Sequence, residues 1–85
     1  MKTIFSEEYK LVLRHMIDAR KHAGYSQSKL AEMLQKPQSF VSKYERGERR
    51  LDIVEIVKIS KLLKIDPHLI IQKIDQELEC LDKVE

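Results

Sequence analysis

Two short segments decide the fold of this chain: YSQSKLAEML at residues 25–34 and SFVSKYERG at residues 39–47. Their apolar residues recur at three- and four-residue steps, the period of an amphipathic helix: Leu30, Ala31 and Leu34 in the first, Val41 and Tyr44 in the second. Between the segments, Pro37 disfavours helical geometry at Lys36 and is suited to open the next helix. The sequence therefore predicts two short helices, over 27–35 and 38–46, joined by a tight turn.

Apolar periodicity predicts three further helices, over 6–23, 53–63 and 67–81. Gly24 can close the first helix in a left-handed conformation, and Ser26 follows as a candidate N-cap. Asp52 with Glu55 three residues later has the form of a capping box. The inward face of the helix over 53–63 is expected to draw on these residues: Ile53, Ile56, Val57, Ile59, Ser60, Leu62 and Leu63. The prediction is an all-α fold of five helices, with residues 1–85 as one helix-turn-helix domain.

Charge is divided unevenly along the 85 residues. Residues 1–50 carry eleven Lys and Arg against six Asp and Glu, a balance of +5, whereas residues 51–85 carry five against eight, a balance of −3. A basic half suits a polyanion such as DNA, and an acidic half is better placed away from phosphates.

Other classes of function find little support in the sequence. The single cysteine, Cys80, cannot form an internal disulfide and lies far along the chain from the three histidines, so no metal-ligand spacing is present and no cofactor is expected. The chain has no apolar run of about 20 residues and no signal-peptide pattern, which favours the cytoplasm. It also lacks a catalytic triad and a glycine-rich phosphate loop, so we expect no enzyme.

Two helices joined by a tight turn, the second with a polar outer row, fit the requirements of a major-groove reader. The two segments quoted above closely resemble the helix-turn-helix of the phage repressor and Cro class, the XRE-like family, and the likeness extends over about residues 17–70. The resemblance implies a lambda-repressor-like domain that binds double-stranded DNA in the major groove. It further implies a homodimer on a two-fold symmetric operator and a role in transcription regulation, typically as a repressor.

The resemblance also implies a DNA-binding set: Gln27, Gln38, Ser39, Phe40, Ser42, Lys43, Arg46, Arg49 and Arg50. In this set Gln27 would hold a phosphate at a helix N-terminus, and Gln38 would read a base, for example adenine. Lys43 would reach guanine or a phosphate, while Ser39 is suited to a base or a phosphate and Ser42 stays open. Phe40 could pack on a thymine methyl or fill the edge of the core. The arginines of the loop would grip the sugar-phosphate backbone, although a merely solvated basic loop is the alternative.

Two positions carry structural expectations. The resemblance implies a largely buried ion pair between Arg20 and Glu45, which would join the first helix to the third. Gln35 stands where the family usually has glycine, so either a positive φ at this residue stores strain of order 1 kcal/mol, or the turn differs slightly from that of the family.

The last predicted helix carries an apolar stripe with the 3-4-3 spacing of a heptad seam: Ile71, Ile74, Leu78 and Leu81. We interpret its end as a dimer interface and its start, with Ile70, as part of the core. The alternative to a DNA-binding regulator is a protein-interaction module on the same fold, either antitoxin-like or an anti-regulator. The polar row of Gln38, Ser39 and Lys43 argues against that alternative, since protein-binding surfaces expose aromatic or aliphatic anchors.

Overall fold

The computed structural model describes the backbone of residues 6–84 and the side chains through residue 79. Within that range it contains five α-helices and no strand, which confirms the all-α class: α1 Glu7–His22, α2 Gln27–Leu34, α3 Gln38–Glu45, α4 Ile53–Leu62 and α5 Pro67–Val84. The C-terminal ends of α1 to α4 lie one residue before the predicted ends, whereas α5 continues three residues beyond the predicted end at residue 81. Among the described residues, no helix combines the length and the apolar character needed to cross a bilayer.

Side chains cap the starts of α1, α2 and α4, and at the start of α5 the Asp66 carboxylate accepts from the His68 N–H. The Ser6 hydroxyl accepts from the Tyr9 N–H at 3.2 Å, and the Ser26 hydroxyl accepts from the Lys29 N–H at 3.0 Å. At α4 the predicted capping box is present. The Asp52 carboxylate accepts from the Glu55 N–H at 2.7 Å, and the Glu55 carboxylate accepts from the Asp52 N–H at 2.9 Å. These bonds satisfy N–H groups that have no partner inside the helix, and they set where each helix begins.

The turn after α2 uses a residue other than glycine in the left-handed region. Gln35 has φ 59° and ψ 44°. This is the positive φ considered in the sequence analysis for a residue at the family's usual glycine position. Its N–H donates to the Glu32 carbonyl and the Lys36 N–H donates to the Ala31 carbonyl, a closure typical of helix ends. Lys64 after α4 has φ 61°, a second such position that the sequence did not reveal.

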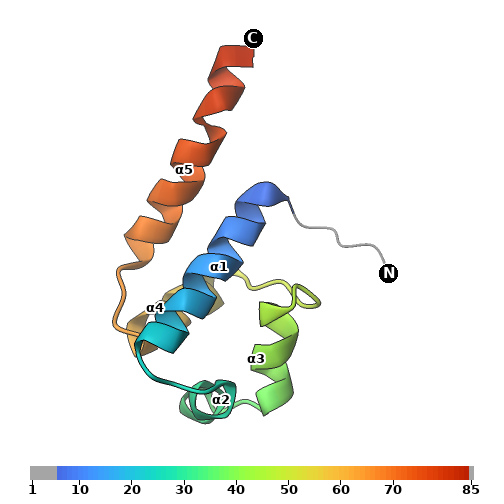
Figure 1. The fold of residues 1–85 in the computed structure, drawn as a ribbon, viewed down its shortest axis with the longest axis vertical. Helices are drawn as coiled ribbons and strands as arrows, with labels where there is room; N and C mark the ends of the chain where they lie inside the picture. Colours follow the sequence, from blue (N-terminus) through green and yellow to red (C-terminus); the bar gives the residue numbers. More distant parts are fainter. Residues whose placement is uncertain (1–5, 85) are drawn as a thin grey trace.

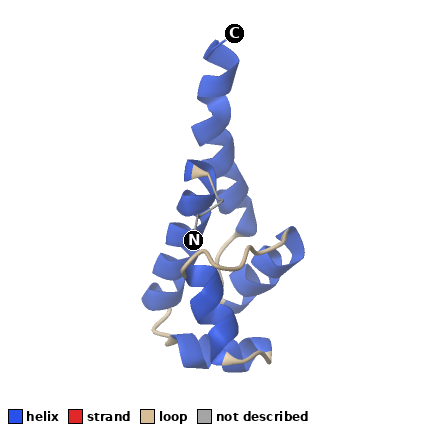
Figure 2. Cartoon of the chain, turned by 90° about the vertical axis from the view of Figure 1, so that its right-hand side faces the viewer, coloured by secondary structure: helices blue, strands red, loops and turns tan. Residues whose placement is uncertain are grey.

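The core lies where α1, α4 and the first turns of α5 meet the pair formed by α2 and α3. Its buried apolar members are Tyr9, Val12, Leu13, Met16, Leu30, Ala31, Val41, Tyr44, Leu51, Ile59, Leu63 and Ile70. In Figure 1, α2 and α3 lie at one end of the molecule, and α5 runs beside α1 before its last turns extend past the other helices. Figure 2 shows the same extension from the side.

Ile53 was expected in the core and is instead 59% exposed. It is the first residue of α4, directly after the Asp52 cap, and the end of the core is filled from the preceding loop by Leu51, which is only 7% exposed. The Leu51 N–H donates to the hydroxyl of Tyr9 at 3.0 Å, which fixes the loop at this point. Leu51 and Ile56 join the same core across the cap, as in a hydrophobic staple, so Ile53 remains outside.

His15 on α1 makes the stability of the folded chain depend on pH. Burial lowers the pKa of His15 below 6.5, nearby Lys73 lowers it further, and Asp18 partly opposes them. The unfolded chain therefore takes up this proton first as the pH falls, and stability is lost as the pH falls through about 6.5 and below. We expect the free energy of unfolding in urea to fall over that interval, and to fall less in His15→Gln. Equal losses in the two proteins would contradict this prediction.

Candidate nucleic-acid interface

Helix α3 separates a buried face from a polar outer row. Val41 and Tyr44 have no exposed surface, while Gln38, Ser39 and Lys43 are exposed. Ser42 is half-buried, and its hydroxyl donates to the Ser39 carbonyl at 3.3 Å. The row expected to project from the helix is therefore free of the protein's own core.

Gln38 at the start of α3 is held by α2. Its side-chain oxygen accepts from the Ser28 hydroxyl at 2.9 Å, a bond between two exposed residues on neighbouring helices. This contact limits the orientations of the amide that stands first in the polar row.

Phe40 lies at the edge of the core, one of the two positions left open for it. Its half-buried ring packs against the core cluster and meets the Tyr44 ring edge-on, with centroids 5.6 Å apart. Two cations lie near the rest of the ring: Lys36 Nζ is 5.4 Å and the Arg49 guanidinium carbon 4.7 Å from its centroid. A cation at this distance is attracted by the negative face of the ring. Phe40 thus connects α3 to the turn before it and the loop after it.

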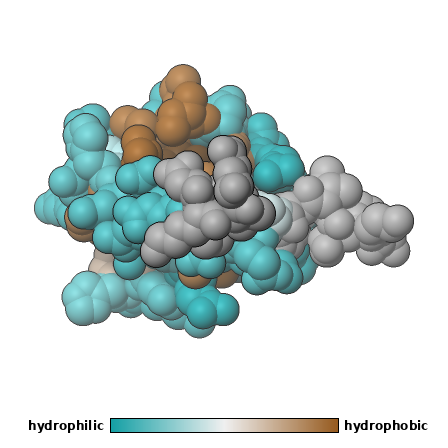
Figure 3. Space-filling view, turned by 90° about the horizontal axis from the view of Figure 1, so that it is seen from above, coloured by the Kyte–Doolittle hydropathy of each residue, from teal (hydrophilic) through white to brown (hydrophobic). Residues whose placement is uncertain are grey.

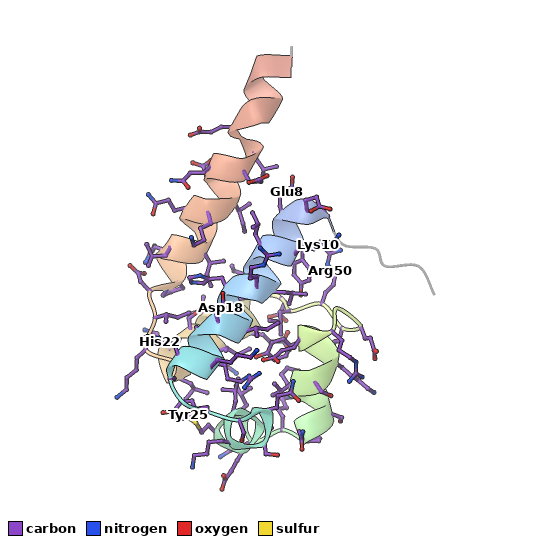
Figure 4. The ribbon with its side chains drawn as sticks, viewed as in Figure 1. Glu8, Lys10, Asp18, His22, Tyr25 and Arg50 are labelled. Atoms are coloured by element: carbon purple, nitrogen blue, oxygen red, sulfur yellow. The ribbon has the colours of Figure 1, made fainter. Side chains whose placement is uncertain are left out.

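The loop between α3 and α4 exposes three arginines, each with a partner. Arg46 pairs with Glu48 at 2.9 Å, and this hydrogen bond lowers the pKa of the Glu48 carboxyl. Arg49 pairs with Glu55 at 2.9 Å. The Arg50 guanidinium lies 4.7 Å from the centroid of the Tyr9 ring, and Figure 4 shows Arg50 beside the start of α1. The loop thus presents three exposed cations, each in contact with another side chain of the protein.

Arg20 and Glu45 form a buried ion pair between α1 and α3. Two bonds of 2.8 and 3.1 Å join the guanidinium to the carboxylate, and their side chains are only 10% and 6% exposed. Arg20 also donates to the Tyr25 carbonyl at 2.8 Å, and the Gln27 amide donates to Glu45 at 2.9 Å. Gln27, expected at a phosphate, thus contacts this pair through its Nε2. The cluster ties the start of α2 to both neighbouring helices.

Comparison with known proteins adds two findings. A helix-turn-helix family model matches residues 16–70, more than half of the chain. The chain belongs to the XRE family of helix-turn-helix proteins. A similar solved structure is described as an XRE-family like protein from Pseudomonas syringae pv. tomato str. DC3000, with 38% identity and a TM-score of 0.77. The match covers 82% of this chain and 85% of that one, whereas no curated protein matches. Membership in this family makes the protein a DNA-binding regulator.

Sequence reasoning missed several residues that organise the site of this XRE protein. Ser28 orients Gln38, Lys36 and Phe40 form a cation–π contact, and Glu55 holds Arg49. The capping-box pattern did single out Glu55, but only for its local role at the start of α4. Its second partner comes from a loop whose path the sequence does not reveal.

The apolar stripe of α5 is only partly covered. Ile71 is 52% exposed, Ile74 packs against the core and Leu78 is half-buried, while Leu81 lies outside the described side chains. Other exposed apolar residues are Ile53, Val54 and Leu69. Seen from above in Figure 3, a group of hydrophobic residues lies at the upper margin beside mainly hydrophilic neighbours.

Proposed function

We propose that this XRE protein is a transcriptional repressor that binds a two-fold symmetric operator as a homodimer. Helix α3 would enter the major groove with Gln38, Ser39 and Lys43 at base edges. Gln27 and the arginines of residues 46–50 would contact the sugar-phosphate backbone and set the register. The observation that carries the proposal is the exposed polar row of α3, mounted on a fully buried Val41 and Tyr44.

The distribution of charge and apolar surface supports the same arrangement. The basic half of the chain contains α2, α3 and the arginine loop, whereas the acidic half contains α5. In the proposed dimer, Ile71, Ile74, Leu78 and Leu81 of two subunits pair away from the DNA. The exposure of Ile71 favours this interface, because an exposed apolar stripe beside the core is suited to a contact. Such a dimer would read half-sites with centres about 34–36 Å apart.

Binding selection from random duplex DNA, followed by titration at rising salt, tests the proposal. Selected sequences should show two-fold symmetry, and affinity should fall steeply with salt, because protein cations displace counterions from the phosphates. Sedimentation should find two subunits on each selected duplex. Absent or salt-independent binding across the library would refute DNA binding, and asymmetric sites bound by one subunit would refute the dimer.

Replacements of Gln38 and Arg49 should have different effects. Gln38→Ala should cost about 1–3 kcal/mol on the preferred sequence and relax the preference at one base pair, because it removes a base contact. Arg49→Ala should weaken every sequence alike and reduce the salt dependence, because it removes a backbone contact. Titration of both variants against the selected duplex, single-base variants of it and a scrambled duplex measures the difference. If the two variants show the same profile, the assigned roles are wrong.

A further inference from the structure

The Arg49 guanidinium donates three hydrogen bonds within the protein, all from its two terminal nitrogens. Its Nη1 donates to Glu55 Oε1 and to the Arg50 carbonyl, both at 3.0 Å, and its Nη2 donates to Glu55 Oε2 at 2.9 Å. A guanidinium has five N–H groups, so these bonds leave two within the described structure, one on Nε and one on Nη2. Those two lie parallel on one edge of the planar group. They form the two-donor fork that matches a pair of phosphate oxygens.

Glu55 is itself fixed. Its Oε1 accepts from the Asp52 N–H at 2.9 Å as part of the capping box, and its side chain is 21% exposed. The hydrogen bond from Arg49 holds the pKa of the Glu55 carboxyl below its usual value of 4.5, so the group is charged at neutral pH. A carboxylate anchored to the helix backbone can hold a guanidinium in one orientation.

The ring of Phe40 restricts Arg49 from a second direction. The guanidinium carbon lies 4.7 Å from the ring centroid, and the ring is packed on α3 against Tyr44. Arg49 is therefore bound to α4 through Glu55 and to α3 through Phe40. Its position relative to the polar row of α3 follows from both contacts.

We propose that Glu55 is a positioning residue for DNA recognition, which orients Arg49 on Phe40 so that its Nε–Nη2 edge faces a phosphate of the operator. This inference rests on the proposed function and deepens it. Glu55 itself touches no nucleotide. It restricts the conformations of Arg49 before DNA binds, so that less side-chain entropy is lost on binding. The positioned Arg49 then helps to fix the register of α3 in the groove.

The proposal reverses the sign that simple electrostatics gives. Removal of one negative charge near the DNA should strengthen binding to every duplex, because repulsion from the phosphates falls. Glu48 provides the matched case: it also pairs with an arginine of the loop, but its side chain is 49% exposed and no bond from a helix cap holds it. Glu48→Gln should follow the simple rule, and Glu55→Gln should not.

The experiment compares Glu55→Gln, Glu48→Gln and Glu55→Asp in the full chain, each titrated against the selected operator and a scrambled duplex of equal length. Glu48→Gln should raise both affinities by similar small factors. Glu55→Gln should instead lower both affinities by similar factors of about tenfold, the value of one well-placed charge-assisted hydrogen bond, because a phosphate contact is made on every sequence. Glu55→Asp retains the charge but is too short to hold both partners, so it should also lower both affinities. Helical circular dichroism and melting curves establish that each variant is folded.

A measurement without DNA provides an independent test. In the free wild-type protein the Arg49 Nε–H should give a resolved NMR signal of an ordered side chain, which Glu55→Gln loses and Glu48→Gln keeps. If Glu55→Gln strengthens both duplexes as Glu48→Gln does, or the Arg49 signal is unchanged by it, Glu55 has no positioning role. If the wild type binds no duplex, the proposed function fails and this inference with it. Wild-type binding to DNA with unaltered affinities in Glu55→Gln overturns the inference alone.

Discussion

Replacement of Arg20 with leucine should destabilise the fold by about 3–5 kcal/mol, because it leaves a buried carboxylate without its cation. Glu45 is 6% exposed at its side chain and would keep only the Gln27 amide as a partner. The Tyr25 carbonyl would lose its donor as well. Urea unfolding followed by circular dichroism measures the loss.

Two comparison variants separate charge burial from general damage. Arg46→Leu breaks an ion pair whose side chains are 56% and 49% exposed, and it should cost far less stability than Arg20→Leu because solvent screens the exposed pair. The double variant Arg20→Leu with Glu45→Leu removes both buried charges and should recover a large part of the loss. If the double variant is less stable than Arg20→Leu, the stranded charge is not the cause.

The second large effect is expected at Leu30, which anchors α2. Leu30 is fully buried in the core cluster, so Leu30→Ala should cost about 2–5 kcal/mol through lost apolar burial and the cavity that remains. The same unfolding measurement applies. Leu69→Ala on α5 is the control, since Leu69 is 46% exposed and a surface change costs about 0.5 kcal/mol or less. Similar losses at both positions would contradict the assigned core.

The parts of the fold that depend on local pattern could be predicted from the sequence. The polar caps at Ser26 and Asp52 and the proline before α3 set helix starts through contacts within a few residues. The left-handed conformation of Gln35 was foreseen only as a condition, from the glycine that the family usually has at that position. Each signal acts over one turn of helix, which is the range that a sequence pattern describes.

The parts that depend on the path of the loop could not be predicted. Apolar periodicity assigned Ile53 to the core, but Leu51 is equally apolar, and the path of the loop, held by the bond from the Leu51 N–H to the Tyr9 hydroxyl, buries Leu51 instead. The contact between Arg49 and Glu55 has the same origin, since the two residues lie six positions apart and the irregular segment before α4 runs between them. Roles in DNA binding were assigned to single residues, whereas the structure couples them in pairs through partners that the family resemblance does not identify.

The bond between Ser28 and Gln38 has a consequence for the chemistry that Gln38 presents outward. The amide oxygen of Gln38 uses one lone pair to accept from the Ser28 hydroxyl on α2. Both hydrogens of the amide nitrogen remain available to donate hydrogen bonds. The glutamine is thereby biased toward donating. A nucleotide edge rich in acceptors, such as the O6 and N7 of guanine, suits that polarity better than the mixed edge of adenine. Ser28 on α2, which is not on the helix that enters the groove, would then influence which base of the operator is preferred.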